Sequence, residues 1–261
     1  MIKFNGHIIE QNHFPDGSLF IRNEVRPAVF ETLNYIEWYY ENDAELFTLI
    51  CLKKSLGNTR VELEMPYIPH ARMDRVKNEE DIFTLKYFCE IINSLNFSSV
   101  YVLDPHSDVA PALLDRVHFT EVEEMIDYTI DTIDSNKLLC YFPDAGAAKR
   151  YSSMINMPYT YGNKIRDWET GKIKGLSIAD PDLVKGKDIL IIDDICSRGG
   201  TFYYSAKALK EAGANKIYLY VTHCENTILE GEVLTSGLIE KVYTTNSIFT
   251  KEHEKVEVYE L

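Results

Sequence analysis

The sequence lacks the features that would place the protein in a membrane or in an oxidising compartment. No apolar run approaches the roughly 18 residues of a membrane-spanning helix. The N-terminus shows no basic region followed by an apolar stretch, so we expect no ordinary secretory signal. The five cysteines are scattered, and none forms a Cys-x-x-Cys pair. This pattern indicates reduced thiols rather than a disulfide framework or a zinc site, and therefore a cytoplasmic protein.

Positive charge is also scarce. The 261 residues include 27 Lys and Arg against 41 Asp and Glu, a formal charge of −14. Nucleic acids and anionic membranes attract cationic surfaces, so this balance argues against both as partners and favours small-molecule substrates. Hydrophobic residues make up 45% and charged residues 26% of the chain, which is ordinary for a globular protein.

Internal repeats, low-complexity tracts and Gly/Ser linkers are absent, and the pattern alternates apolar strands with amphipathic helices. The expected strands cover residues 46–52, 60–68, 99–104, 187–194 and 216–223, and the expected helices cover 81–95 and 201–212. Such alternation is typical of parallel sheets with helices on both faces, so the predicted fold class is α/β.

Two features suggest how the chain is divided. A cluster of Asp, Ser and Asn at residues 132–138 predicts a boundary between two α/β halves, 1–135 and 136–261. The polar, glycine-containing segment 160–181 lies between structured stretches, and we expect it to be a loop.

Acidic residues close two of the predicted strands, at the edge where α/β folds bind ligands. One strand ends in Asp104, and another runs into Asp193 and Asp194, followed by a glycine-bearing loop and Thr201 at a predicted helix start. Backbone N–H groups at a helix N-terminus bind phosphate, and paired carboxylates can accept hydrogen bonds from a vicinal diol. The combination predicts a sugar-phosphate site, with the phosphate on the loop and the diol on the acids.

The segment Asp193-Asp194-Ile195-Cys196-Ser197-Arg198-Gly199-Gly200-Thr201 resembles the pentose-phosphate loop of the phosphoribosyltransferase-type fold. Further segments occur in the order found in the ribose-phosphate diphosphokinases (PRPP synthetases) and narrow the resemblance to that family. They are residues 13–17, 66–75, 102–108, 143–150, 163–166, 222–223 and 244–248. The resemblance implies two tandem phosphoribosyltransferase-like domains, each a parallel sheet flanked by helices, with ATP on the first domain and the pentose phosphate on the second.

The reaction implied by this resemblance is a diphosphoryl transfer. The anomeric 1-hydroxyl of a 5-phosphorylated ribose attacks the β-phosphorus of ATP, and AMP leaves. Positioning and charge stabilisation dominate such a transfer, because little covalent work falls to the protein. The resemblance implies Mg²⁺ as well, which prefers oxygen ligands and phosphates and needs only one or two side chains.

The resemblance also assigns roles to individual residues. The expected catalytic residues are Lys164, Arg166, Asp193 and Asp194, the first two as mobile cations that close over the transferring group. Ribose and phosphate are expected on Asp144, Ser197, Arg198, Gly199, Gly200 and Thr201. ATP is expected on Phe14, Asp16, Ser18, Arg72, Asp74 and His106, and Mg²⁺ on His106 and Asp144. Phe14 would receive adenine bound to a neighbouring subunit, so we expect a homodimer or a higher homo-oligomer.

The loop departs from the family pattern at two positions. Ser197 replaces an expected acid and Arg198 an expected threonine, which makes the loop more positive where the 5-phosphate would lie. A monophosphate does not need that charge, whereas a 5-diphosphate ester could use it, because Arg binds phosphate in a bidentate fork. Two acceptors therefore stay open: ribose 5-phosphate, giving PRPP, and ADP-ribose, giving ADP-ribose pyrophosphate for NAD salvage.

Other readings also stay open. Ser18 and Met73 stand where the family has Glu and Gln, which weakens the adenine and triphosphate assignment. A PRPP-consuming phosphoribosyltransferase would share the pentose-phosphate loop, but it would not need the mobile cations or the N-terminal half. An inactive regulatory homologue would have no reason to retain Lys164 and Arg166 together. Release of AMP from ATP distinguishes these classes.

Overall fold

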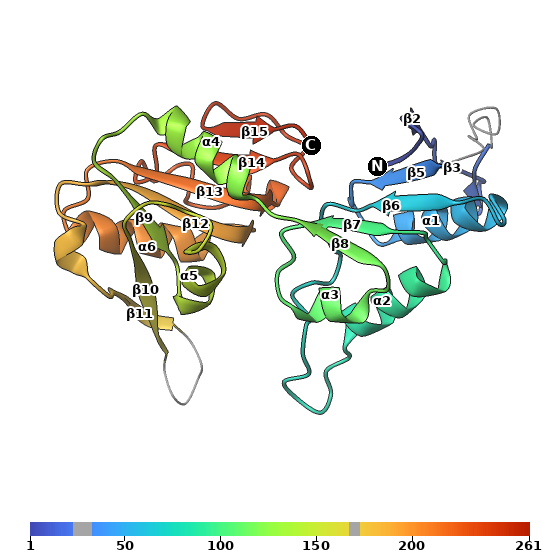
Figure 1. Ribbon diagram of the computed structural model, residues 1–261, viewed down its shortest axis with the longest axis horizontal. Helices are drawn as coiled ribbons and strands as arrows, with labels where there is room; N and C mark the ends of the chain where they lie inside the picture. The colour runs from blue at the N-terminus through green and yellow to red at the C-terminus, as the bar shows by residue number, and fades with distance from the viewer. Residues whose placement is uncertain (23–32, 167–172) are drawn as a thin grey trace. The chain divides into compact units, whose positions relative to one another are not determined.

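A computed structural model describes residues 1–22, 33–166 and 173–261, without the side chains of residues 164–166 and 173–176. The chain forms two compact units, Met1–Glu121 and Val122–Leu261. Each unit is built on its own mainly parallel sheet flanked by helices, which confirms the predicted fold class (Figure 1).

The first unit contains a six-stranded sheet in the order β2-β1-β5-β6-β7-β8. Its strands are β1 (Ile2–Phe4), β2 (His7–Ile8), β5 (Asn34–Trp38), β6 (Val61–Glu64), β7 (Val100–Leu103) and β8 (Val117–Thr120). Its helices are α1 (Ala44–Ser55), α2 (Thr84–Ser94) and α3 (Val109–Leu113). A separate hairpin joins β3 (Asn12–His13) to β4 (Leu19–Phe20).

The parallel strands β5 to β8 follow one another both along the chain and across the sheet. Right-handed crossovers between such strands put every connecting helix on the same face. The buried side chains agree, because Leu49 of α1, Phe88 of α2 and Ala110 of α3 share one hydrophobic cluster. The same cluster contains Ile36 and Leu63 from one face of the sheet. The core of this unit therefore lies on one side of its sheet.

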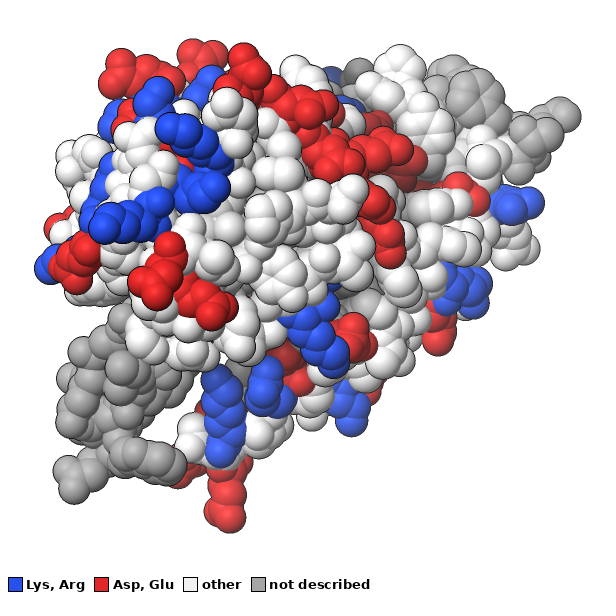
Figure 2. All heavy atoms as spheres, turned by 60° about the vertical axis from the view of Figure 1, so that its left-hand side comes forward, with Lys and Arg blue, Asp and Glu red and all other residues white. Residues whose placement is uncertain are grey.

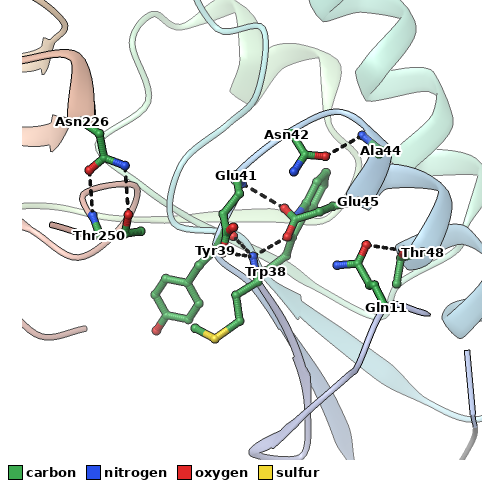
Figure 3. Close-up of polar contacts among 11 residues, drawn as sticks. Gln11, Trp38, Tyr39, Glu41, Asn42, Ala44, Glu45, Thr48, Asn226 and Thr250 are labelled. Carbon is green, nitrogen blue, oxygen red and sulfur yellow. Dashed lines mark hydrogen bonds and ion pairs between the residues drawn. The ribbon is translucent and has the colours of Figure 1, made fainter. Parts of the chain in front are cut away.

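The start of α1 is fixed by a buried carboxylate. Glu45 is 3% exposed, and its side chain accepts hydrogen bonds from Trp38 Nε1 at 2.9 Å, from the Glu41 N–H at 2.9 Å and from the Met1 amino group (Figure 3). A buried carboxylate requires such partners. The apolar run 46–52, predicted as a strand, lies inside α1, so that prediction is wrong. A short apolar run does not by itself distinguish a buried strand from a buried helix.

The second unit contains a seven-stranded sheet in the order β11-β10-β9-β12-β13-β14-β15. Its strands are β9 (Leu138–Phe142), β10 (Tyr159–Arg166), β11 (Ile173–Ile178), β12 (Asp188–Cys196), β13 (Ile217–Cys224), β14 (Lys241–Thr245) and β15 (Val256–Tyr259). Its helices are α4 (Glu123–Ile133), α5 (Ala145–Tyr151) and α6 (Gly200–Glu211), with 3₁₀ turns η2 (Pro181–Leu183) and η3 (Asn226–Glu230).

The direction of winding reverses between β9 and β12. From β9 the chain crosses through α5 to β10 on one side, and from β12 it crosses through α6 to β13 on the other. Two right-handed crossovers in opposite directions put their helices on opposite faces. Phe202 of α6 accordingly shares a core cluster with Ile191, whereas Tyr151 of α5 stacks on Phe142 at a centroid distance of 6.3 Å. Ligands of α/β sheets bind at such a switch point, beyond the carboxyl ends of the strands.

Helix α4 belongs to the second unit. The Thr129 hydroxyl lies 2.8 Å from the Tyr259 hydroxyl, and the Tyr128 and Tyr259 rings lie edge to face at 5.4 Å. The division between the units therefore precedes α4, whereas the sequence predicted a boundary between residues 135 and 136. The polar cluster at 132–138 marks the turn after α4 instead.

The segment 160–181, predicted as a loop, is mainly an antiparallel pair of strands. β10 extends the sheet from β9 and then pairs with β11, with Asn163 opposite Ser177. Strands at the margin of a sheet tolerate polar residues, which explains why the composition suggested a loop. Residues 167–172 lie outside the described part of the chain.

The surface carries charges of both signs. On the face drawn in Figure 2, Lys and Arg side chains lie close to Asp and Glu side chains rather than alone. In the described residues, no helix has both the length and the apolar character needed to cross a bilayer. All five cysteines are free thiols.

Candidate functional site

Asp193 and Asp194 lie toward the carboxyl end of β12, the edge that the sequence predicted, and this edge is the switch point of the second unit. β9 pairs with β12 only as far as Ile191, so both acids lie beyond the last β9 pairing, while Asp193 still pairs with Val221 of β13. β12 continues to Cys196, past the predicted end of the strand. The sheet therefore holds the acid pair on a regular strand instead of on a loop.

The two acids differ in their surroundings. Asp194 is 5% exposed, and its Oδ2 lies 3.2 Å from Nη1 of Arg150 on α5. Burial, followed by the neighbouring charge of Asp194, raises the pKa of Asp193 well above its usual value. Hydrogen-bond donors such as the hydroxyls of a diol would relieve the cost of ionising Asp193. The sequence did not assign Arg150 a role, although it lies in the quoted segment 143–150.

Asp144 caps the helix that follows β9. Its Oδ1 accepts hydrogen bonds from the N–H groups of Gly146 at 2.9 Å and Ala147 at 3.1 Å. The charge of Asp144 also contributes to raising the pKa of Asp193, so the two carboxylates are close in space. The switch point thus brings together the predicted residues Asp144, Asp193 and Asp194.

No group of three His, Cys, Asp or Glu side chains in the described residues is arranged to hold a metal by itself. A magnesium ion that binds through one or two carboxylates and through substrate phosphates does not require such a group. The predicted role of Asp144 as a metal ligand therefore remains a prediction, and so does that of His106.

The predicted phosphate loop connects β12 to α6. Gly199 has φ +76°, and a Cβ at this position would lie 2.2 Å from Cγ2 of Val233, so no larger residue fits. α6 begins at Gly200 and continues through Thr201, which aligns their N–H groups at the N-terminus of a 12-residue helix. The geometry suits phosphate, because the positive end of the helix dipole lies where the N–H groups have no helical partner.

Arg198 is 71% exposed, and its side chain forms an ion pair with Glu230 of η3. Glu230 Oε2 accepts hydrogen bonds from Nε at 3.1 Å and from Nη2 at 2.8 Å. The sequence analysis did not single out Glu230. The adjacent Gly231 approaches the loop closely, since a Cβ there would lie 1.9 Å from the Arg198 carbonyl oxygen.

In the first unit, the loops after β6 and β7 meet around Asp74, which is 7% exposed. Arg75 donates to Asp74 from Nε at 2.9 Å and from Nη2 at 3.2 Å. Hydrogen bonds from Arg75 and Ser107, together with the charges of Arg75 and His106, hold the pKa of Asp74 below its usual value despite burial. The structure thus brings together two predicted ATP residues, Asp74 and His106, and leaves Arg72 exposed.

The remaining predicted ATP residues lie on the turn of the β3–β4 hairpin. Asp16 Oδ1 accepts hydrogen bonds from the Ser18 N–H at 2.9 Å and the Ser18 hydroxyl at 2.6 Å. Those two bonds lower the pKa of Asp16. The turn presents Phe14, which is 53% exposed and lies 5.2 Å from the Phe20 ring. Phe14 is therefore a surface residue and not part of the core.

Lys164 and Arg166 lie on β10, where they pair with Leu176 and Ile173 of β11. Their side chains, and residues 167–172, lie outside the described part of the structure. Their predicted catalytic role stays a prediction.

The later strand ends quoted from the sequence form a buried polar network. His223 Nδ1 lies 2.8 Å from Ser247 Oγ, and the Thr245 hydroxyl donates to the Thr222 carbonyl oxygen at 2.7 Å. Both His223 and Ser247 are at most 2% exposed. The network ties the end of β13 to the turn that follows β14.

Comparisons with known proteins agree with this architecture. Residues 146–249 match the family model of the phosphoribosyl transferase domain. The chain is 27% identical over 249 residues to a ribose-phosphate pyrophosphokinase of Sulfurisphaera tokodaii, covering 92% of this chain and 84% of that protein. It is 29% identical over 254 residues to one of Pyrococcus abyssi, covering 93% and 85%.

The crystal structure of phosphoribosylpyrophosphate synthetase from Mycobacterium smegmatis has the same fold. It superposes with a TM-score of 0.79 at 18% identity, covering 97% of this chain and 86% of that one. The similarity in sequence and in fold runs through both units. Together these comparisons confirm the resemblance that the ordered motifs predicted.

Proposed function

We propose that this chain, a homologue of the ribose-phosphate pyrophosphokinases, is a pyrophosphokinase that moves the β,γ-diphosphate of ATP to the anomeric hydroxyl of a 5-phosphorylated ribose and releases AMP. One observation carries the proposal. The acid pair Asp193 and Asp194 lies at the switch point of the sheet and leads directly into a glycine loop and the N-terminus of α6. The end of β12 therefore provides hydrogen-bond acceptors for a diol, and the start of α6 provides hydrogen-bond donors for a phosphate.

Each part of the acceptor has a matching group in the second unit. The carboxylates of Asp193 and Asp194 accept hydrogen bonds from the 2- and 3-hydroxyls of the ribose. The N–H groups at Gly200 and Thr201 donate to the 5-phosphate. Arg150 lies 3.2 Å from Asp194 and restrains that side chain, so the diol meets a preorganised acceptor.

The ATP is assigned to the first unit, on Arg72, Asp74 and His106, with Lys164 and Arg166 as the cations that stabilise the transferring diphosphate. Mg²⁺, when bound, neutralises charge on the triphosphate, and Asp144 and His106 are the residues that would hold it. Oxygen donors of this type suit Mg²⁺, whereas the use of His106 rests on the family resemblance alone.

The natural acceptor is part of the proposal. The named relatives support ribose 5-phosphate, which would make the product PRPP, a precursor of nucleotides. The exposed guanidinium of Arg198 beside the phosphate loop favours a second candidate, ADP-ribose, because an acceptor with a 5-diphosphate could bind it. The product would then be ADP-ribose pyrophosphate, for NAD salvage.

We also propose a homodimer or a higher homo-oligomer. Phe14, exposed on a surface hairpin, supports this arrangement, because an aromatic ring so placed can reach the adenine bound to a neighbouring copy.

The test is AMP formation from Mg·ATP with ribose 5-phosphate or ADP-ribose supplied separately, and with products identified by mass spectrometry. Release of AMP together with a diphosphorylated ribose supports the proposal, and the better acceptor identifies the substrate. Absence of AMP with both acceptors contradicts it. Consumption of PRPP with a nucleobase and release of diphosphate would then indicate a phosphoribosyltransferase, and inactivity in both assays a regulatory homologue.

A further inference from the structure

The segment 225–233, which follows β13, packs directly against the phosphate loop. The Glu225 N–H donates to the Cys196 carbonyl oxygen at 2.7 Å, where β12 ends. Gly231 approaches the Arg198 carbonyl so closely that a Cβ would lie 1.9 Å from it. Val233 leaves no room for a side chain at residue 199. One backbone hydrogen bond, one close backbone approach and the side chain of Val233 therefore place this segment directly against the loop.

The same segment is anchored on its other side. Asn226 Nδ2 donates to the Thr250 hydroxyl at 2.9 Å, and the Thr250 N–H donates to Asn226 Oδ1 at 3.0 Å (Figure 3). Thr227 Oγ1 donates to Glu225 Oε2 at 3.0 Å. Because the segment is held on both sides, the backbone of Glu230 has a defined position relative to Arg198.

The Arg198–Glu230 pair contributes little to stability, because exposed ion pairs are worth about 0–1 kcal/mol. Its effect is on geometry. One carboxylate oxygen accepts from both Nε and Nη2, which restrains the plane of the guanidinium. The N–H groups that Glu230 does not take, including those of Nη1, are then presented in a fixed direction beside the loop.

We propose that Glu230 is a positioning residue for acceptor recognition, which holds Arg198 so that its remaining N–H groups bind the second phosphate of a ribose 5-diphosphate ester. The inference deepens the proposed function and rests on it for the location of the first phosphate. Ribose 5-phosphate has no second phosphate, so its binding does not depend on Glu230. Glu230 thus contributes to the choice between the two acceptor classes.

Calorimetric titration with ADP-ribose and, separately, with ribose 5-phosphate tests the inference without requiring turnover. In Glu230→Ala we expect the Kd for ADP-ribose to rise roughly five- to tenfold, because the guanidinium is no longer held for phosphate. The Kd for ribose 5-phosphate should stay within about twofold of the unmodified protein. Glu230→Gln, which keeps an acceptor oxygen, should give an intermediate Kd for ADP-ribose.

Two controls separate positioning from charge. Glu232→Ala removes the same charge from a neighbouring exposed residue, and it should change neither Kd. Adding Glu230→Ala to Arg198→Ala should weaken ADP-ribose no further than Arg198→Ala alone, since the two residues act as one unit.

Three results would overturn the inference. They are an unmodified protein that does not bind ADP-ribose, a Glu230→Ala variant that binds ADP-ribose equally or more tightly, and equal weakening of both ligands, which would indicate a purely structural role. A different result would contradict the proposed diphosphate transfer: the unmodified protein would form no AMP from ATP with either acceptor.

Discussion

The two sheets of this protein repeat the same strand–helix–strand unit but are wound differently. In the first unit β5 to β8 run in one direction, with their helices on one face, and the predicted ATP residues Arg72, Asp74 and His106 come from loops after the consecutive strands β6 and β7. In the second unit the direction reverses between β9 and β12, and the acid pair lies at that reversal. At a reversal, the loops that leave two neighbouring strands turn toward opposite faces of the sheet. This leaves a crevice for a ligand between them, at the carboxyl ends of the strands. A sheet wound in one direction must instead build its site from long loops.

A second contrast lies within β12 itself. Asp188 at its start accepts hydrogen bonds from the Ser135 hydroxyl at 2.7 Å, Asn215 Nδ2 at 2.6 Å and the Lys216 N–H at 3.1 Å. Burial alone would raise the pKa of Asp188, but these bonds outweigh it and lower the pKa. Asp193, on the same strand, has a raised pKa. Hydrogen-bond donors thus dominate around the carboxylate at the amino end of the strand, whereas burial and the charge of Asp194 dominate around Asp193.

The largest expected effect tests whether the switch point carries the chemistry. Asp193→Asn should lower the turnover of ATP to AMP by roughly 100-fold or more, because it removes a charged acceptor that the bound ribose uses. Asp188→Asn, the matched change at the other end of β12, should retain turnover within about threefold. If Asp193→Asn retained most of the activity, the carboxyl end of β12 would not differ in function from the amino end that carries Asp188.

The next effect separates the two units by substrate. Arg72→Ala should raise the KM for ATP roughly tenfold, because the variant lacks the exposed guanidinium that is expected to bind the triphosphate. The KM for ribose 5-phosphate should change little, since that substrate is assigned to the second unit. Steady-state AMP release, with one substrate varied at a time, measures both constants. A rise confined to the acceptor KM would contradict the assignment of ATP to the first unit.

The third effect is a pair of stability changes with opposite signs. The raised pKa of Asp193 means that folding costs free energy once the pH exceeds the ordinary carboxyl value of 3.8. Asp193→Asn should therefore stabilise the protein by about 1 kcal/mol at pH 7, and the gain should disappear near pH 4. The lowered pKa of Asp188 stabilises the fold above the unfolded-state pKa, so Asp188→Asn should destabilise it at pH 7 by about 1 kcal/mol.

Urea unfolding at pH 7 and at pH 4 measures both changes. Asp194→Asn provides a further comparison, because it leaves Arg150 without its carboxylate and should destabilise rather than stabilise. Equal shifts for Asp188→Asn and Asp193→Asn would mean that the two ends of β12 do not differ as described.

The smallest effect concerns the exposed pair beside the loop. Glu230→Ala should change the free energy of unfolding by less than about 0.5 kcal/mol, because exposed ion pairs contribute little. Thermal unfolding at low and at high salt measures the change. A large loss of stability would assign Glu230 to the fold rather than to ligand recognition.

Much of the second unit was predictable from the sequence because its signals are local. An apolar run with two acids, then glycines, then a helical pattern fixed the order of β12, the loop and α6 to within two residues at each boundary. In the first unit, the helix predicted over 81–95 covers 84–94, and the strand predicted over 60–68 covers only 61–64.

The features that were missed depend on distant or ambiguous signals. The run 46–52 is apolar in either conformation, and a contact of Glu45 with Met1, which is distant along the chain, accompanies the helix. Arg150 and Glu230 meet their partners from other elements, 44 and 32 residues away along the chain, and no local pattern encodes those pairs. Assignment of α4 to the second unit likewise depends on contacts with Tyr259 at the end of the chain.

The central position of β12 has a consequence for motion. β12 is paired with β9 on one side and β13 on the other, so its amide protons should exchange with deuterium only when the second unit opens as a whole. Asp193 and Asp194 follow the part of β12 that is paired on both sides, whereas Arg198 and Glu230 are exposed. A ribose must therefore fit the acids as they stand, and adaptation to different acceptors falls to side chains that can change without disturbing the cooperative core.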